Sequence, residues 1–266
     1  MIHPTAVVHP GAQIDSSVQI GPYTVIDSDV VVGPDCLVGS HCHLTGKTRI
    51  GRGNRFHAGC VIGDAPQDLK YKDEPTGLII GEDNVFREHF TAHRSNHPEE
   101  VTRIGSHNFL MANAHIGHNS DVGDHVIIAN NAGLGGHVVV QNRAFISANC
   151  LVHQFVRVGT LTLMQGGAAI SKDLPPFTIA WGDNGICGLN VIGLRRAGFT
   201  PEQRLELKRL YHLLFRSGLR LAEALAKAGT HAPDTPSGQL IQFAANSKRG
   251  LCSDSGRAKG GSATVD

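Results

Sequence analysis

Residues 110–134 read LMANAHIGHNSDVGDHVIIANNAGL, and every sixth residue of this stretch, starting at Leu110, is aliphatic. A period of six fits neither the 3.6-residue stripe of a helix nor the two-residue alternation of one strand. It fits a short strand followed by a turn. Three such units close one triangular coil of about 18 residues, so the stretch predicts a parallel β-helix in which the sixth residues point inward.

The same spacing continues over two thirds of the chain, with two interruptions. Stepping by six gives Ile2, Val8, Ile14, Ile20, Ile26, Val32, Val38, Leu44, Ile50, Phe56, Ile62, Ile80, Phe86, Ile104, Leu110, Ile116, Val122, Ile128, Leu134, Val140, Ile146, Val152, Val158, Met164 and Ile170. We call these residues the anchors. The residue four positions after an anchor is usually small, because a second inward position lies in a narrow interior. Cys36, Cys42, Cys60 and Cys150 occupy this slot, which predicts packing rather than a metal site.

We therefore predict a β-helix over residues 1–177, with loops at about 64–79 and 93–103, where the repeat fails. In repeat proteins, insertions leave one face as loops and often carry function. Coils stack at strand spacing, so this segment should form about nine or ten coils. Its flat faces can pack around a threefold axis, which predicts a homotrimer.

After residue 177 the character of the chain changes. Residues 178–199 are expected to form a connection, 200–251 a helical domain, and 252–266 a disordered tail poor in apolar residues. Thr200 is expected to cap a helix that begins at Pro201, because Thr and Pro favour those two positions. Two further helices are predicted near 219–227 and 238–246, and the helical domain can cover the open end of the β-helix.

Charge and cysteine content limit the function classes. The chain has 24 basic and 23 acidic residues, a balance that gives no reason to expect nucleic-acid binding. No run of apolar residues is long enough to span a bilayer, and the N-terminus lacks the pattern of a secretory signal. We therefore expect a cytoplasmic protein with reduced cysteines and no transmembrane segment.

Four of the 16 histidines lie in the middle of the repeat, in NAHIGHN, GGHV and VHQF. With 18 residues per coil, His118 should stack on Gly136 and lie beside His137 on the neighbouring coil. Two hypotheses follow from this cluster. Either His118 is a general base, since neutral imidazole can remove a proton from a hydroxyl, or the histidines bind a metal.

Six short stretches carry a more specific resemblance. They are QDLKY (67–71), NAHIGH (113–118), ANNAGLGGHV (129–138), VHQF (152–155), LPPF (174–177) and RSG (216–218). The chain resembles the acyl-[acyl-carrier-protein]–UDP-N-acetylglucosamine O-acyltransferases of lipid A synthesis, from its first repeats to about residue 251. The hexapeptide repeat alone is shared by many transferases, whereas QDLKY together with AHIxH is much more specific.

The resemblance implies a left-handed β-helix and transfer of a 3-hydroxyacyl group from acyl carrier protein to the 3-hydroxyl of UDP-N-acetylglucosamine. His118 would take the hydroxyl proton, and the backbone N–H of Gly136 would stabilise the oxyanion. The substrate-binding residues would be Gln67, Asp68, Lys70, His93, His115, His137, His153, Gln154, Asn190 and Arg196. Gly166 would leave the acyl groove open for a longer chain. No metal or cofactor is implied.

The same resemblance implies an acidic carrier protein as a partner. Its docking surface would draw on Arg195, Arg196, Lys208, Arg209, Arg216, Arg220, Lys248 and Arg249. For any one of these residues, an ordinary solvated helix face explains the charge equally well.

The sequence departs from the family pattern at several positions. Ser95 and Asn96 replace a Gly-Thr pair in the second loop, Ile192 replaces a glutamate that contacts the nucleotide, and Ala197 replaces a basic residue. An acceptor with a 3-amino group therefore remains an alternative. So do the related N-acyltransferase, a coenzyme A acetyltransferase, a β-helical zinc hydratase and a non-catalytic scaffold, although the last would predict flat threonine ladders that are absent.

Overall fold

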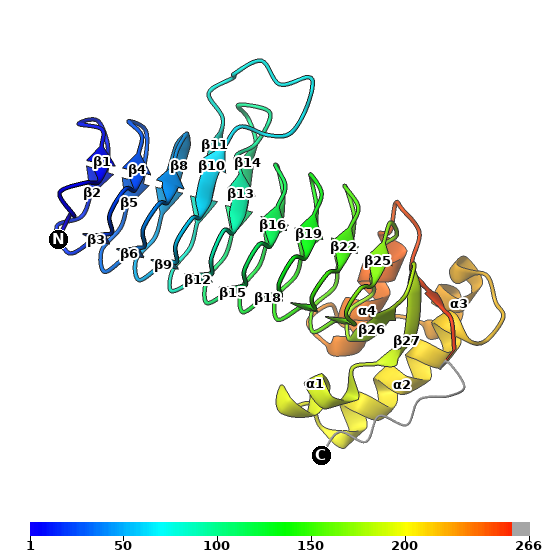
Figure 1. The fold of residues 1–266 in the computed structure, drawn as a ribbon. Helices are drawn as coiled ribbons and strands as arrows, with labels where there is room; N and C mark the ends of the chain where they lie inside the picture. The colour runs from blue at the N-terminus through cyan, green and yellow to red at the C-terminus, as the bar shows by residue number, and fades with distance from the viewer. Residues whose placement is uncertain (257–266) are drawn as a thin grey trace.

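The computed structural model describes residues 1–256, which form a triangular β-helix followed by a small group of helices (Figure 1). The β-helix has three faces, each a sheet in which strands one coil apart pair in parallel. Ile116 pairs with Leu134, and Leu134 with Val152, so the register advances by the 18 residues expected from the repeat. The mainly β fold class is thus confirmed.

Sheet 1 has nine strands, sheet 2 eight and sheet 3 eleven within the described residues. Sheet 1 contains β1 (Val7–Val8), β4 (Val25–Ile26), β7 (His43–Leu44), β10 (Val61–Asp64), β13 (Thr91–His93), β16 (His115–Ile116), β19 (Gly133–Leu134), β22 (Leu151–Val152) and β25 (Ala169–Ile170). Sheet 2 contains β2 (Gln13–Ile14), β5 (Val31–Val32), β8 (Lys47–Ile50), β11 (Gly77–Ile80), β14 (Val101–Ile104), β17 (Asp121–Val122), β20 (Val139–Val140) and β23 (Arg157–Val158). Sheet 3 contains β3 (Gln19–Ile20), β6 (Leu37–Val38), β9 (Arg55–Phe56), β12 (Val85–Phe86), β15 (Phe109–Leu110), β18 (Ile127–Ile128), β21 (Phe145–Ile146), β24 (Leu163–Met164), β26 (Thr178–Trp181), β27 (Gly185–Leu189) and β28 (Ser253–Asp254).

The anchors form the core. From Ile20 onward every anchor is buried, whereas Ile2, Val8 and Ile14 are more exposed because no coil of the described chain covers that end. The four cysteines of the small inward slot are buried beside the anchors and form no disulfides. Their role as packing residues is consistent with the reason given for the slot: only small side chains fit there.

Two loops leave the β-helix at the same corner, where sheet 1 turns into sheet 2. They connect β10 to β11 and β13 to β14, so we define the first loop as residues 65–76 and the second as residues 94–100. The strands on either side extend a few residues into the segments expected to be loops. In Figure 1 the first loop rises well clear of the coils.

The C-terminal part contains more strand than the sequence suggested. Residues 178–199, expected to be a connection, include the antiparallel pair β26–β27 and helix α1 (Val191–Arg196). The expectation of disorder from residue 252 is wrong at its start, because Cys252 is buried and β28 pairs with β27. The rest of that predicted tail, residues 257–266, lies outside the described residues.

Three longer helices follow: α2 (Pro201–Phe215), α3 (Leu221–Ala228) and α4 (Pro236–Ala245). Thr200 caps α2 as expected, in a capping box with Gln203. An ion pair joins α4 to the β-helix, since Arg157 contacts the buried carboxylate of Asp173 at 2.8 Å and donates to the carbonyl of Phe243. None of the helices within residues 1–256 is long and apolar enough to cross a membrane.

Candidate active site

The corner between sheets 1 and 2 carries the residues with catalytic chemistry. His118, Gly136 and Gln154 occupy equivalent positions on three successive coils of this corner, one coil of 18 residues apart. The backbone N–H of His137 donates to the carbonyl of His118 at 2.8 Å, and that of Phe155 to the carbonyl of Gly136 at 3.0 Å. Repetition along the chain thus becomes a stacked column directly beside the two loops.

The imidazole of His118 lies against Gly136. A Cβ atom at position 136 would be 2.7 Å from both Cε1 and Nε2 of the ring, so only glycine leaves room for it. Among the backbone hydrogen bonds of residues 1–256, the N–H of Gly136 has no acceptor. A base nitrogen and an available N–H donor therefore lie close together, as the sequence predicted from the repeat.

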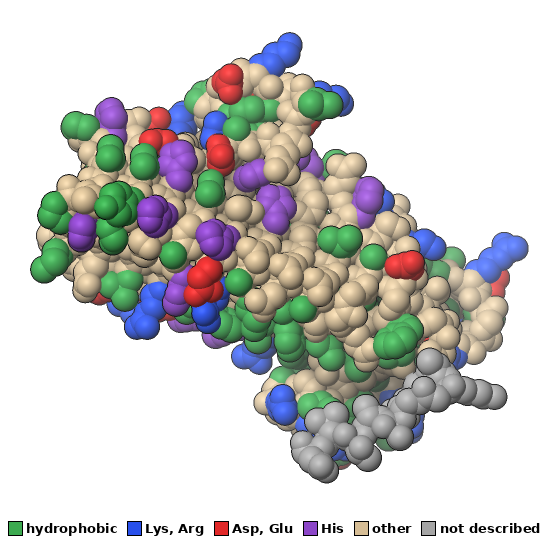
Figure 2. Space-filling model, viewed as in Figure 1, with side chains coloured by type: hydrophobic (Ala, Val, Ile, Leu, Met, Phe, Trp, Pro, Cys, Tyr) green, Lys and Arg blue, Asp and Glu red, His purple; other side chains and the backbone are tan. Residues whose placement is uncertain are grey.

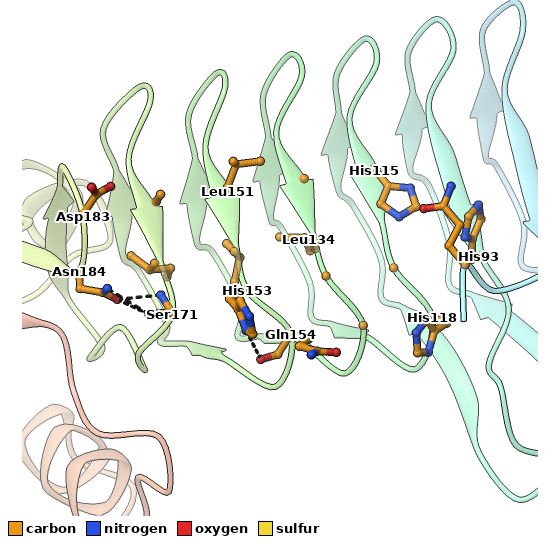
Figure 3. A pocket seen from close by; sticks show the side chains of 18 residues that line it. His93, His115, His118, Leu134, Leu151, His153, Gln154, Ser171, Asp183 and Asn184 are labelled. Carbon is orange, nitrogen blue, oxygen red and sulfur yellow. Dashed lines mark hydrogen bonds between the residues drawn. The ribbon is translucent and has the colours of Figure 1, made fainter. Parts of the chain in front are cut away.

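A cavity of about 760 Å³ opens on the outer surface of sheet 1 next to His118 (Figure 3). We call it the face cavity. It runs from His93, His115 and His118 at one end to Asp183 and Asn184 at the other. Its remaining lining consists of Gln67, Gly117, Gly133, Leu134, Gly135, Gly136, Leu151, Val152, His153, Gln154, Ala169, Ile170 and Ser171. The many glycine and aliphatic residues leave an apolar trough suited to a hydrocarbon chain.

A second cavity, of about 570 Å³, lies under the loops, and we call it the loop cavity. It is lined by Gln67, Asp68, Lys70, Tyr71, Glu74, Asn96, His97, Glu100, His118, His137, Gln154 and Phe155. The two cavities share Gln67, His118 and Gln154. His118 therefore lies where an apolar trough meets a polar, charged compartment. Figure 2 shows histidine side chains grouped on this face of the molecule, near the projecting loop.

Burial keeps the neighbouring histidines neutral. It lowers the pKa of His115 to about 4 and also lowers the pKa of His93 and of His137. His115 Nδ1 lies 2.8 Å from the hydroxyl of Thr91, and the Nδ1 atom of His93 is buried with no hydrogen-bond partner. These rings can therefore act as neutral donors or acceptors toward a substrate at neutral pH.

Contacts between the loops determine the shape of the loop cavity. The side-chain amide of Asn96 donates to Asp68 Oδ2 at 2.8 Å, and the backbone N–H of Lys70 donates to Asp68 Oδ1 at 3.0 Å. The Lys70 amide, and after it the Asn96 side chain, hold the pKa of the Asp68 carboxyl below its ordinary value. The carboxylate is therefore ionised, and its acceptor capacity is directed into the cavity.

Sequence reasoning missed three residues that contact this centre. Asn119 Oδ1 lies 2.7 Å from His118 Nδ1, Glu100 contacts the side chain of Asn119, and the ring of Phe155 stacks on that of His137 with centroids 4.6 Å apart. Adjacency to His118 could have indicated Asn119. Nothing in the sequence indicates Glu100, because its loop has no repeat register.

Three of the expected site residues lie elsewhere in the chain. Gly166 belongs to the turn between β24 and β25, outside both cavities, and a Cβ there would meet only the carbonyl of Ala148 at 3.5 Å. Asn190 caps α1 by accepting from the N–H of Gly193 at 3.0 Å, and Arg196 is exposed near the end of that helix. One chain therefore does not bring these residues to His118.

Metal binding has no ligand set within one chain. In the part of the chain that the structure describes, no group of three or more His, Cys, Asp or Glu side chains is placed to hold a metal ion. The zinc alternative therefore gains no geometric support from the histidine cluster.

The basic residues named from the sequence are spread over the helical end. Arg195, Lys208 and Arg216 line a groove of about 750 Å³ between β27, α1 and α2, together with Arg204 and the apolar side chains of Leu189, Val191, Leu194 and Leu205. Arg216 is already paired with Asp254. Arg249 instead donates to the carbonyl of Ser171, at the edge of the face cavity.

Comparison with known proteins supports one assignment along the whole chain. A family model described as UDP N-acetylglucosamine O-acyltransferase, domain 2, matches residues 173–252, and one for the bacterial transferase hexapeptide matches residues 29–64 and 102–136. The chain is 48% identical to an acyl-[acyl-carrier-protein]–UDP-N-acetylglucosamine O-acyltransferase from an Anaeromyxobacter species, over 94% of this chain and 98% of that protein. A protein of the same name from Halorhodospira halophila is 43% identical with the same coverage.

Solved structures agree with these relatives. The UDP-N-acetylglucosamine acyltransferase of Francisella novicida superposes with a TM-score of 0.91 at 36% identity, covering 96% of this chain and 95% of that one. Fold and site together thus define a hexapeptide-repeat acyltransferase with a left-handed β-helix. More specifically, the chain belongs to the family of acyl-[acyl-carrier-protein]–UDP-N-acetylglucosamine O-acyltransferases, as its resemblance to that family predicted.

Proposed function

We propose that this chain transfers an (R)-3-hydroxyacyl group from acyl carrier protein to the 3-hydroxyl of the glucosamine of UDP-N-acetylglucosamine, with His118 as general base. One observation carries the mechanistic part: the His118 ring lies against Gly136, whose N–H has no backbone acceptor, at the junction of an apolar and a polar cavity. The family assignment supplies the reaction class.

The chemical step needs only groups at this junction. His118 Nε2 takes the proton of the sugar 3-hydroxyl as the oxygen attacks the thioester carbon. The N–H of Gly136 donates to the oxyanion of the tetrahedral intermediate, in the manner of an oxyanion hole. When the carbon–sulfur bond breaks, the protonated His118 returns its proton to the leaving thiolate. The products are the O-acyl ester and the carrier's free thiol, and no external acid is required.

The two cavities suit the two parts of the product. The sugar and its phosphates would occupy the loop cavity, where Asp68 accepts from sugar hydroxyls and Lys70 faces the phosphates. The acyl chain would lie in the trough formed by glycines and by Leu151, a residue 59% exposed in the single chain. Gln67, His93, His115, His137, His153 and Gln154 would complete the contacts.

A homotrimer would bring in the residues that one chain leaves outside. Asn190, Arg196 and Gly166 are absent from both cavities, so they can serve substrate only from a neighbouring protomer. Mixing His118→Asn chains with Arg196→Ala chains tests this arrangement. Activity above that of either parent after subunit exchange supports shared sites, whereas no recovery, or a monomer in light scattering, argues against them.

The groove on α1 and α2 is the proposed docking surface for acidic acyl carrier protein. Its exposed cations, Arg195 and Lys208, would attract the carrier and release it at higher salt. Charge reversal by Lys208→Glu should raise KM for the acylated carrier and leave KM for the nucleotide sugar unchanged. Because the carrier and the reduced, buried cysteines both suit a reducing compartment, we place the reaction in the cytoplasm.

The decisive experiment is acyl transfer from a series of 3-hydroxyacyl carrier proteins to UDP-N-acetylglucosamine. Replacing the base by His118→Asn should lower kcat by about 10²- to 10⁴-fold. The matched control is His125→Asn, an exposed histidine in a turn of a different corner, which should keep full activity. Transfer only to a 3-amino sugar acceptor would change the proposed product to an amide. No transfer to either acceptor would refute the proposal.

A further inference from the structure

The second nitrogen of His118 is held by a network from the second loop. His118 Nδ1 lies 2.7 Å from Asn119 Oδ1, and that oxygen also accepts from the backbone N–H of Asn96 at 3.1 Å. The side-chain amide of Asn119 donates to Glu100 Oε2. The backbone N–H of Asn119 donates to the hydroxyl of Thr102 at 2.8 Å, so this residue is fixed from four directions.

These partners leave only one orientation for the Asn119 amide. A carboxylate can only accept, so the NH₂ group must face Glu100, and a backbone N–H can only donate, so the oxygen must face Asn96. The atom next to His118 Nδ1 is therefore an acceptor, which requires Nδ1 to carry the hydrogen. The lone pair of neutral His118 is then on Nε2, the nitrogen beside Gly136.

Glu100 supplies the charge of this network. Within residues 1–256 no Lys or Arg forms an ion pair with it, and its nearest cationic group is His137 Nδ1 at 4.0 Å. Burial lowers the pKa of His137, which keeps that ring neutral at physiological pH. The Glu100 carboxylate is thus one amide away from His118, with no competing cation. A proton gained by His118 would be stabilised by this negative charge through the polarised amide.

We propose that Asn119 and Glu100 are positioning residues for the general base, acting as a relay from His118 through an amide to a carboxylate on the second loop. The relay selects the tautomer with Nε2 unprotonated and stabilises the imidazolium formed during attack. This inference rests on the proposed function, because it presupposes His118 as the base. The same loop holds Asp68 through Asn96, so one loop orders both the sugar compartment and the base.

Moving the charge along the relay tests the proposal. Glu100→Gln keeps an acceptor for the Asn119 amide but removes the charge, and it should lower kcat about tenfold with both KM values unchanged. Asn119→Asp puts two carboxylates in contact and should lower kcat at least as much. In the double variant Glu100→Gln/Asn119→Asp, the new glutamine amide can donate to the new carboxylate, which accepts directly from His118. Its kcat should return to within about threefold of the wild type, since charge and hydrogen bonds are restored.

The pH profile separates a relay from a merely structural role. The groups facing His118 are Asp68, Glu100, His93, His115 and His137. Of these, only Glu100 changes charge in the Glu100→Gln variant, so the acidic limb of kcat should move to lower pH there and return in the double variant. An unchanged profile and kcat for Glu100→Gln would overturn the proposal. A loss that the double variant does not recover would overturn it too, because the carboxylate would then act at its original place.

Imidazole nitrogen NMR of the free protein tests the tautomer without any turnover. His118 should carry its proton on Nδ1 in the wild type. An Nε2–H tautomer, with His118→Asn still inactive, would overturn the relay and leave the proposed function standing. Full activity of His118→Asn would overturn the proposed function itself, whichever tautomer is found.

Discussion

The contact between Gly136 and His118 allows a quantitative prediction for the variant Gly136→Ala. The added Cβ would lie 2.7 Å from Cε1 and Nε2 of the ring, whereas ordinary contacts begin near 3.4 Å. The ring must therefore move by about 0.7 Å, the difference between these distances. Gly136 does not have a positive φ, so alanine fits its backbone conformation, and its N–H remains in place as an oxyanion donor.

The expected effect is a loss of base geometry without unfolding. A misplacement approaching 1 Å costs about 30- to 100-fold in rate, equivalent to roughly 2–2.7 kcal/mol of transition-state stabilisation. The ring can swing toward the open cavity, so thermal stability should change little. The assay is kcat/KM for acyl transfer, measured with the melting temperature of the same preparation.

The neighbouring variant Gly135→Ala is the matched comparison. Its Cβ would lie 2.8 Å from the backbone nitrogen of Gln154, which cannot yield as a side chain can. Gly135→Ala should therefore lower the melting temperature, whereas Gly136→Ala should lower activity. Wild-type activity for Gly136→Ala would refute the placement of the base. Equal destabilisation by both variants would refute the distinction between ring and backbone contacts.

Three further predictions concern stability. The pKa of His115 falls from its ordinary 6.5 to about 4 on folding, so the unfolded chain binds a proton at higher pH than the folded one. The free energy of unfolding should therefore fall on acidification from pH 6.5 to 4, by on the order of 3 kcal/mol from this group, and His115→Gln should remove that part of the pH dependence; parallel denaturation curves for the two proteins would contradict this. Asp173→Ala leaves Arg157 without its buried partner and should cost about 3 kcal/mol in denaturant unfolding, unlike an exposed pair such as Arg52–Glu82. Thr200→Ala removes the N-cap of α2 and should cost about 1 kcal/mol, so an unchanged unfolding midpoint would show that the cap is not used.

The repeat made the catalytic corner predictable. A β-helix with 18 residues per coil places residues by simple addition, so the anchors, the inward cysteines and the stacking of His118 on Gly136 all followed from spacing. The structure has each of these features because parallel pairing between coils leaves no freedom of register. The hand of the helix did not follow from spacing and came from the resemblance to known transferases.

Outside the repeat, addition along the chain no longer places residues. Glu100 reaches Asn119 only because the second loop folds back over the corner, and β28 pairs with β27 only because the chain returns from α4 to the end of sheet 3. Such contacts depend on side-chain fit and on the hydrogen-bonding needs of buried backbone, which no local pattern encodes. The sequence by itself determined the β-helix and the position of its base. Only the tertiary structure decided which groups hold that base, because loops are placed by long-range contacts and not by a period.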